Sequence, residues 1–415
     1  MEIPASMIPD RKQQIATQMQ KAALDGLVCA LPKHVLLLSG YWPVVGTSMA
    51  VARSNGEVCL IVPEDEKPFA AKSRATNIET FKPSSLDKIT TAEETVVQPL
   101  SHTLKLLLNS EPRIGYELGA DTQPASYAAM HLYQGSIPEI IRRALPSANI
   151  IPADNLLRNL CAIKSAEEIG SIETACRIAA RGFAWAAEVL RSGLTEVEAA
   201  AELRKLFAAA LQDFPDVERA EAFVFVMSGT NSAKASGAFA HSSTRRIETG
   251  DLILVHCNSF ANGYCTDITR TFSLGELDDK RRAMYEAIFA AREAALKTIA
   301  PGVKAADVDR AARAVLRERG FGSDFKHSTG HGVGFGAISP NAPPRIHPQS
   351  EDVLQPGMVF NVEPAIYLED YGGMRHCDMV AVTETGFRLL TPFQSQINEL
   401  TLGAPRQKSA QAYNS

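Results

Sequence analysis

Hydrophobic and polar positions follow two different patterns along the chain, and the change between them falls near residue 155. Before it, short apolar runs bounded by Gly, Pro and Asn alternate with segments of helical spacing. This alternation predicts an α/β domain over residues 1–155. The strand-like runs are Leu27–Leu31, Val35–Leu38, Met49–Ala52, Val58–Val62 and Ile114–Tyr116, and the predicted helices are Arg11–Leu24, Ala125–Leu132 and Glu139–Leu145.

After residue 155 the predicted helices are longer and carry clear start signals. Ser165 and Glu168 form a capping-box pattern that predicts a helix to about Arg191, and Thr195 with Glu198 opens the next helix in the same way. The order of helix, helix, strand and strand then repeats, which suggests an internal pseudo-duplication with a cleft between its halves. The remaining predicted elements are a strand at Phe223–Met227, helices at Asp278–Ala300 and Ala305–Arg319, and strands up to Val382.

One hairpin organises this second part of the chain. Asn262-Gly263 lies between two β-prone runs and predicts a two-residue turn. That turn pairs His256 with Thr269 and Asn258 with Asp267. His256 and Asp267 then lie diagonally on one face, within reach of a shared ion. A hairpin whose polar face meets solvent is the simpler interpretation, so the metal hypothesis depends on where other ligands fall.

Composition narrows the class of protein. The 415 residues favour two domains, and 45% hydrophobic with 21% charged residues is typical of a soluble globular chain. A net charge of −5 without a basic run gives no support for nucleic-acid binding. The first ten residues lack the features of a signal peptide, and no apolar run approaches the ~20 residues of a membrane span. Seven cysteines without a C-x-x-C pair suit free thiols in a reducing cytoplasm, so we expect a cytoplasmic protein with no nucleic-acid or membrane partner.

Further candidate ligands follow the hairpin. His331 lies between glycines in T-G-H-G-V-G, and Glu363 closes the run V-F-N-V-E. A predicted strand over 374–380 turns Arg375 and Cys377 to one face and His376 and Asp378 to the other. A lone histidine or buried cysteine is more often a core residue than a ligand. Five candidates from two halves of one domain favour a metal site, and they are His256, Asp267, His331, Glu363 and Cys377.

Several ordered motifs resemble the pita-bread family of methionine aminopeptidase, Xaa-Pro aminopeptidase, prolidase and creatinase. The motifs are G-D-L-I-L-V (250–255), G-Y-C-T-D-I-T-R-T-F (263–272), T-G-H-G-V-G (329–334), G-M-V-F-N-V-E-P-A-I-Y (357–367) and G-G-M-R (372–375). The N-terminal R-K-Q-Q-I, L-D-G-L-V and L-L-L-S-G-Y resemble the domain that precedes the catalytic domain in the prolidase and creatinase branch. The resemblance implies an α/β N-terminal domain (1–155), an α+β pita-bread catalytic domain with pseudo-twofold symmetry (156–403), a polar tail (404–415) and a homodimer.

The resemblance also implies a ligand set, from which this chain departs twice. Asp267, His331 and Glu363 match the second, third and fourth of the five ligands that hold two divalent ions in the family's metallopeptidases. His256 stands where the family's first Asp belongs, and Cys377 stands where its last, bridging Glu belongs. Nitrogen, oxygen and sulfur ligands favour one ion, zinc or iron rather than manganese. Because a thiolate can bridge, a dinuclear site stays open, as does loss of the metal, which the resemblance to creatinase allows.

The substrate channel departs from the family as well. Its two histidines align with Phe239 and Ile338, and a short insertion at Pro340–Pro343 follows. Losing both histidines predicts a drier, smaller pocket and argues against ordinary peptide cleavage. Tyr264 and Arg375 complete the candidate substrate-binding residues, with Arg375 holding either a substrate carboxylate or an internal acid such as Asp267.

These residues support three hypotheses about function. The first is a metal-dependent hydrolase of a C–N bond in a small amide, Xaa-Pro-like or dipeptide-like substrate, in which Glu363 with His241 or His327 handles protons. His327 has a positioning or packing role as its alternative. The second is a metal-independent, creatinase-like hydrolase or lyase, and the third is a non-catalytic binding protein on the same fold.

Overall fold

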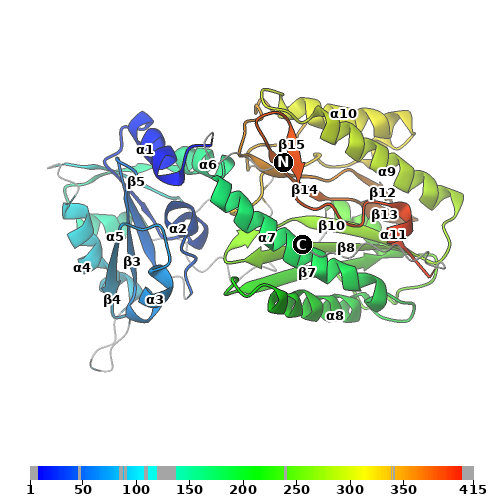
Figure 1. Cartoon of the computed structure of the whole chain (residues 1–415), viewed down its shortest axis with the longest axis horizontal. Coiled ribbons are helices and arrows are strands. Elements are labelled where there is room, and N and C mark those ends of the chain that lie inside the picture. The colour runs from blue at the N-terminus through cyan, green and yellow to red at the C-terminus, as the bar shows by residue number, and fades with distance from the viewer. Residues whose placement is uncertain are drawn as a thin grey trace.

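The computed structural model describes residues 8–44, 48–83, 87, 91–106, 111–118, 137–237, 241–337, 339 and 342–403. Within them the chain forms two bodies that lie side by side, an N-terminal body and a larger C-terminal body (Figure 1). The helix expected at Ala125–Leu132 lies outside the described residues. No helix in the described part of the chain has the length and apolar character needed to cross a membrane.

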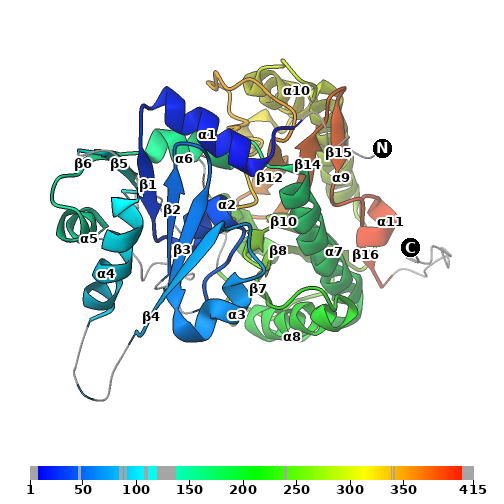
Figure 2. The same ribbon diagram turned by 60° about the vertical axis from the view of Figure 1, so that its left-hand side comes forward.

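The N-terminal body is built around a six-stranded sheet in the order β4-β3-β2-β1-β5-β6. Alternate strand residues face opposite sides, so both faces are covered by helices. Helices α4 and α5 cover one face, and α1, α2 and α6 lie on the other (Figure 2). The strands are β1 (Gly26–Cys29), β2 (Met49–Arg53), β3 (Val58–Pro63), β4 (Asn77–Phe81), β5 (Arg113–Tyr116) and β6 (Asn149–Pro152). The helices are α1 (Arg11–Lys21), α2 (Pro32–Ser39), α3 (Lys67–Ala70), α4 (Ala92–Lys105), α5 (Ile137–Ala144) and α6 (Asp154–Ala162).

The run Val35–Leu38 is helical, so its prediction as a strand-like segment is wrong. It lies inside α2, which has Pro32 in its first turn and ends at Gly40, where φ is 77°. Proline is tolerated in the first turn of a helix, and a left-handed glycine ends one. Four apolar residues do not distinguish a buried strand from a buried helix, whereas these flanking residues do.

The C-terminal body repeats one order of elements, as the sequence predicts. Its first half has α7 (Ala166–Val189), α8 (Glu196–Ala209) and a sheet ordered β16-β10-β8-β7, with β9 paired to β8. Both predicted capping boxes are present, at Ser165 and Thr195. The second half begins with α9 (Asp279–Thr298) and α10 (Ala305–Glu318). The strands and last helix are β7 (Ala220–Ser228), β8 (Leu252–Ala261), β9 (Tyr264–Cys265), β10 (Ile268–Leu274), β11 (Val359–Val362), β12 (Ala365–Leu368), β13 (Gly372–Arg375), β14 (Asp378–Val382), β15 (Phe387–Leu389), α11 (Ile397–Leu400) and β16 (Thr401–Leu402).

The predicted hairpin turn is confirmed. Asn262 and Gly263 have φ values of 47° and 87°, which is the backbone of a two-residue type I′ turn. The same register continues into β10, where Thr269 pairs with His256. The two halves of the body join here, because Thr269 also forms a bridge to Cys377.

The two bodies meet at the tip of this hairpin. A side chain on Gly263 would lie 2.5 Å from the ring of Trp42, so the indole rests directly against the turn. Arg219 stacks on that ring at 4.3 Å and donates a hydrogen bond to the carbonyl of Pro43. A second connection runs between Arg11 and Glu168, which form a buried ion pair. The N-terminal body therefore covers the hairpin turn.

Candidate functional site

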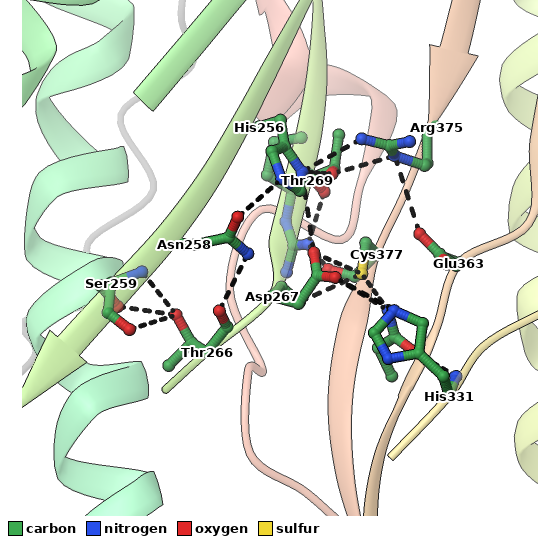
Figure 3. Close-up of polar contacts among 12 residues, drawn as sticks. His256, Asn258, Ser259, Thr266, Asp267, Thr269, His331, Glu363, Arg375 and Cys377 are labelled. Carbon is green, nitrogen blue, oxygen red and sulfur yellow. Dashed lines mark hydrogen bonds and ion pairs between the residues drawn. The ribbon is translucent and has the colours of Figure 1, made fainter. Parts of the chain in front are cut away.

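The candidate site lies where the two halves of the C-terminal body come together. His256 comes from β8, Asp267 from the segment before β10, and Cys377 from the break between β13 and β14. His331 lies in a loop beside β11, and Glu363 follows that strand directly. Figure 3 shows these side chains turned toward one another around Asp267. The pseudo-duplicated fold thus gathers residues that are more than 100 positions apart.

Asp267 is the centre of this cluster. Its Oδ1 lies 3.7 Å from Nδ1 of His256 and 3.8 Å from Sγ of Cys377. Its Oδ2 lies 3.5 Å from Nε2 of His331 and accepts a hydrogen bond from Asn361 at 3.3 Å. Burial raises the pKa of the Asp267 carboxyl, but the hydrogen bond and charge of His331, with the charge of Arg375, outweigh it, so the pKa is lowered. Asp267 is therefore an anion inside the protein.

His256 is neutral and both its ring nitrogens are engaged. Arg375 is only a donor, so its guanidinium donates to Nδ1 of His256, at 3.0 Å. Nε2 then carries the proton and donates to Oδ1 of Asn258 at 3.0 Å, and Asn258 in turn donates to the carbonyl of Thr266. Burial, with the positive charge of Arg375, lowers the pKa of His256 to about 4 in spite of the attraction of Asp267.

Glu363 faces Arg375 and carries a strongly shifted pKa. Its Oε2 lies 3.8 Å from Nε of Arg375, and the side chain is buried. Burial and then the charge of Asp267 raise the pKa of Glu363 to about 7, against the weaker opposing effect of Arg375. The internal acid that pairs with Arg375 is thus Glu363. A carboxyl with a pKa near 7 can both accept and release a proton at neutral pH.

The break between β13 and β14 decides which side chains face the cluster. Cys377 Sγ contacts the carbonyl oxygen of Asp267 at 3.1 Å, while its neighbour His376 lies 3.4 Å from Asp378 on the opposite side. Asp378 there accepts hydrogen bonds from Arg270 and Arg292. Burial, together with the charges of Asp267 and Glu363, raises the pKa of the Cys377 thiol well above its usual value. The alternation expected from the sequence is present although the strand is interrupted.

Three predicted residues take other positions. His327 donates from Nδ1 to the carbonyl of Ser328 and accepts at Nε2 from the hydroxyl of Tyr367, to which Arg375 also donates. His327 is therefore connected to Arg375 through the hydroxyl of Tyr367. His241 is exposed, and its carbonyl accepts a hydrogen bond from Asn231. Tyr264 is buried against Phe335. Phe239 and Ile338 lie outside the described residues.

Asn361, Thr269 and Tyr367 belong to the cluster and were not among the sequence candidates. Asn361 donates toward Asp267 and lies 3.6 Å from Cys377 Sγ. Thr269 receives a hydrogen bond from Arg375 and contacts His256. A signal for Asn361 was present, because it lies two residues before Glu363 in one strand motif and so shares its face.

Comparison with known proteins identifies the class. Residues 170–384 match the model of Metallopeptidase family M24, and the chain belongs to this family. It is therefore an enzyme related to prolidases, and family membership implies dependence on a divalent metal.

Particular relatives extend the likeness over nearly the whole chain. The chain is 30% identical over 388 residues to the Xaa-Pro dipeptidase of Pyrococcus furiosus, covering 94% of this chain and 99% of that one. The prolidase of Pyrococcus horikoshii OT3 superposes with a TM-score of 0.71 at 29% identity, over 92% of this chain and 98% of that chain. An Xaa-Pro dipeptidase of Bacillus anthracis gives a TM-score of 0.74 at 25% identity, over 94% and 99%. The predicted fold class, an α/β N-terminal part followed by a pita-bread part, is confirmed.

Proposed function

We propose that this enzyme hydrolyses the C–N bond of a small, dipeptide-like substrate with the help of one divalent ion at Asp267. The observation that carries the proposal is the arrangement of donors around that carboxylate. Nitrogen and sulfur atoms from His256, His331 and Cys377 lie 3.5–3.8 Å from its two oxygens. In a tetrahedral site with bonds of 2.0–2.3 Å, neighbouring ligand atoms are ~3.3–3.5 Å apart. Each donor is therefore close to a ligand distance from Asp267, but among the described residues no three of these ligand atoms lie within 4.8 Å of one another, so an ion would have to draw them inward.

A single ion suits this site better than the family's pair. His256 stands where the family has its first Asp, and Cys377 stands where it has its bridging Glu. These replacements remove two carboxylate charges that two dications would need. Arg375 contributes a positive charge beside Glu363, at 3.8 Å, which compensates part of the remaining acid. A thiol and imidazoles among the donors favour zinc, with iron as the second choice.

The chain's own residues divide the remaining work. The ion, when bound, would polarise the carbonyl of the scissile bond and lower the pKa of a bound water to ~7. Glu363, whose pKa burial raises to about 7, takes the proton from the attacking water and delivers it to the leaving nitrogen. Arg375 positions Glu363 and His256 through the contacts that it makes with both. His327 supports Arg375 through Tyr367.

The substrate class rests on the relatives. Two relatives that align over 94% of this chain are named Xaa-Pro dipeptidases, so a dipeptide with a C-terminal proline is the first substrate to test. The replacement of the channel histidines by Phe239 and Ile338 favours a smaller and more apolar amide. Assays with Xaa-Pro dipeptides beside small N-acyl amides distinguish these two possibilities.

One observation favours a second candidate, a metal-independent hydrolase. Nδ1 of His256 accepts a hydrogen bond from Arg375, and a guanidinium next to a ligand nitrogen competes with an ion for that nitrogen. Glu363 and His331 would then act as acid and base without a metal.

Metal analysis of purified protein decides between the two candidates. The wild type is compared with Asp267→Asn, which keeps the shape of the side chain but removes its charge, and with His256→Ala. We expect Asp267→Asn to lose about one ion per chain together with activity. The metal-independent enzyme would be favoured by a different result: an active wild type, and both variants with the same ion content as the wild type.

A further inference from the structure

A second group of ligand-type side chains lies in the N-terminal body, far from Asp267 in the chain. Cys29 is the last residue of β1, and Glu117 directly follows β5. These two strands are parallel neighbours, so both residues emerge at the same edge of the sheet. His34 lies in the first turns of α2, which begins at that edge. The carboxyl ends of parallel strands are a common place for binding sites in α/β sheets.

The three side chains form a tight and buried group. In the part of the chain that the structure describes, they are the one set of His, Cys, Asp and Glu residues whose ligand atoms all lie within 4.8 Å of one another. Cys29 is 0% exposed, His34 6% and Glu117 4%. Oε2 of Glu117 lies 2.5 Å from Nδ1 of His34. The thiol of Cys29, the ring of His34 and both carboxylate oxygens of Glu117 therefore belong to buried residues.

The carboxylate is fixed before any ion arrives. Oε1 of Glu117 accepts hydrogen bonds from the backbone N–H groups of Ala30 and Leu31, both at 2.6 Å. Its Oε2 is thereby aimed at His34 and at the Cys29 thiol, with which Glu117 also interacts. Backbone contacts of this kind hold a ligand in one orientation, as partners outside the coordination sphere do in metal sites.

The charges of the group match a divalent ion. One thiolate, from Cys29, and one carboxylate, from Glu117, together carry two negative charges. A dication bound between them would therefore leave the buried group without net charge, as burial requires.

We propose that Cys29, His34 and Glu117 hold a zinc ion in the N-terminal body. Sulfur, nitrogen and oxygen are all donor types that zinc binds in proteins. The 2.5 Å contact between His34 and Glu117 would open to ~3.3 Å, the ligand spacing in a tetrahedral zinc site. The ion would tie α2 to the edge of the sheet. The simpler interpretation is a hydrogen-bonded network without metal.

Zinc analysis of four proteins separates this site from the one at Asp267. We expect about two ions per chain in the wild type, one in Asp267→Asn, one in Cys29→Ser and none in the double variant. Cys59→Ser is the matched control, because Cys59 is also a buried thiol of the same sheet, on β3. It should keep the wild-type ion content. If Cys29→Ser loses an ion and Asp267→Asn does not, the site at Cys29 is supported and the site at Asp267 is overturned. If Asp267→Asn loses an ion and Cys29→Ser does not, only the site at Cys29 is overturned.

Cobalt substitution gives a readout that does not depend on activity. Cys377→Ala protein is stripped of metal and loaded with Co²⁺, so that no thiolate remains at Asp267. We expect the near-ultraviolet thiolate-to-cobalt charge-transfer band, and we expect His34→Asn in the same background to weaken it. If Cys29→Ser fails to fold, this band alone decides. Its absence from folded Cys377→Ala protein would overturn the proposal and leave the hydrogen-bonded network.

Discussion

Asp267 and Glu363 carry the same functional group in one cluster, yet their surroundings shift them in opposite directions. Hydrogen bonding and charge from His331, with the charge of Arg375, lower the pKa of Asp267 against its burial. Burial and the charge of Asp267 raise the pKa of Glu363 to about 7. Two carboxyls whose pKa values are pushed apart can divide the roles of fixed anion and proton carrier. At this scale the charge of Glu363 and the orientation of Cys377 and His376 matter more than the size of the side chains.

The first prediction concerns Glu363. Glu363→Gln keeps the shape of the side chain but cannot accept a proton, so kcat should fall about 10²–10⁴-fold, the usual contribution of a general base. KM should change much less. Steady-state kinetics on an Xaa-Pro dipeptide measures both constants. A variant with near wild-type kcat would exclude Glu363 as the proton carrier.

The second prediction concerns the faces of neighbouring residues. Cys377 contacts Asp267, whereas His376 lies toward Asp378 on the other side. Cys377→Ala should therefore reduce the ion bound at Asp267, and His376→Ala should retain it. Elemental analysis of both variants in the Cys29→Ser background removes the contribution of the N-terminal site. The opposite pattern would contradict the assigned faces.

At the scale of elements, local signals in the sequence were sufficient wherever the structure is local. The Asn262-Gly263 pair fixed the hairpin register, and the boxes at Ser165 and Thr195 fixed two helix starts. Prediction was wrong at Val35–Leu38, where an apolar run has no period of its own.

Contacts between distant elements could not be read from local patterns. Nothing near Arg375 in the sequence indicates that its guanidinium reaches His256, 119 positions away. The same holds for Cys29 and Glu117, which are brought together by the parallel pairing of β1 with β5. Their residue types form no spaced motif, so only the topology of the sheet makes them neighbours.

The third prediction belongs to the hairpin element. Gly263→Ala places a side chain at a φ of 87°, which costs ~1–2 kcal/mol, and drives it against the ring of Trp42 at 2.5 Å. The matched control is Gly302→Ala, where φ is 83° and no atom lies within 4 Å of the added Cβ. Thermal unfolding should show a larger loss of stability for Gly263→Ala, with lower activity because Asp267 follows the turn. Equal losses would mean that Trp42 does not constrain the hairpin.

At the scale of the whole molecule, the C-terminal body removes several histidines from solvent. Desolvation is the main cause that lowers the pKa of three of them to about 4; they are His256 and His376, which are buried, and His327, which is half-buried. In the unfolded chain the pKa of histidine is ~6.5. Between these values the unfolded state binds more protons than the folded state, so stability rises with pH across this window.

The fourth prediction follows from this imbalance. The free energy of unfolding should fall as pH drops from about 6.5 toward 4, although the raised pKa of Glu363 opposes part of the effect. His376→Leu should reduce that dependence by about one proton, because the ring packs against Phe289 and its nitrogens lack hydrogen-bond partners among the described residues. Denaturant titrations at several pH values measure the slope, and an unaltered slope in His376→Leu would contradict the assignment.

The cover that Trp42 and Arg219 place over the hairpin turn has a consequence for protein engineering. Hairpin tips are usually the first choice for inserted epitopes, linkers or reporter tags, since they project into solvent and tolerate extra length. Here an insertion between Asn262 and Gly263 would have to displace an indole from the other body. The open turn at Gly302, with no atom within 4 Å of an added Cβ, is the better attachment point for such a fusion.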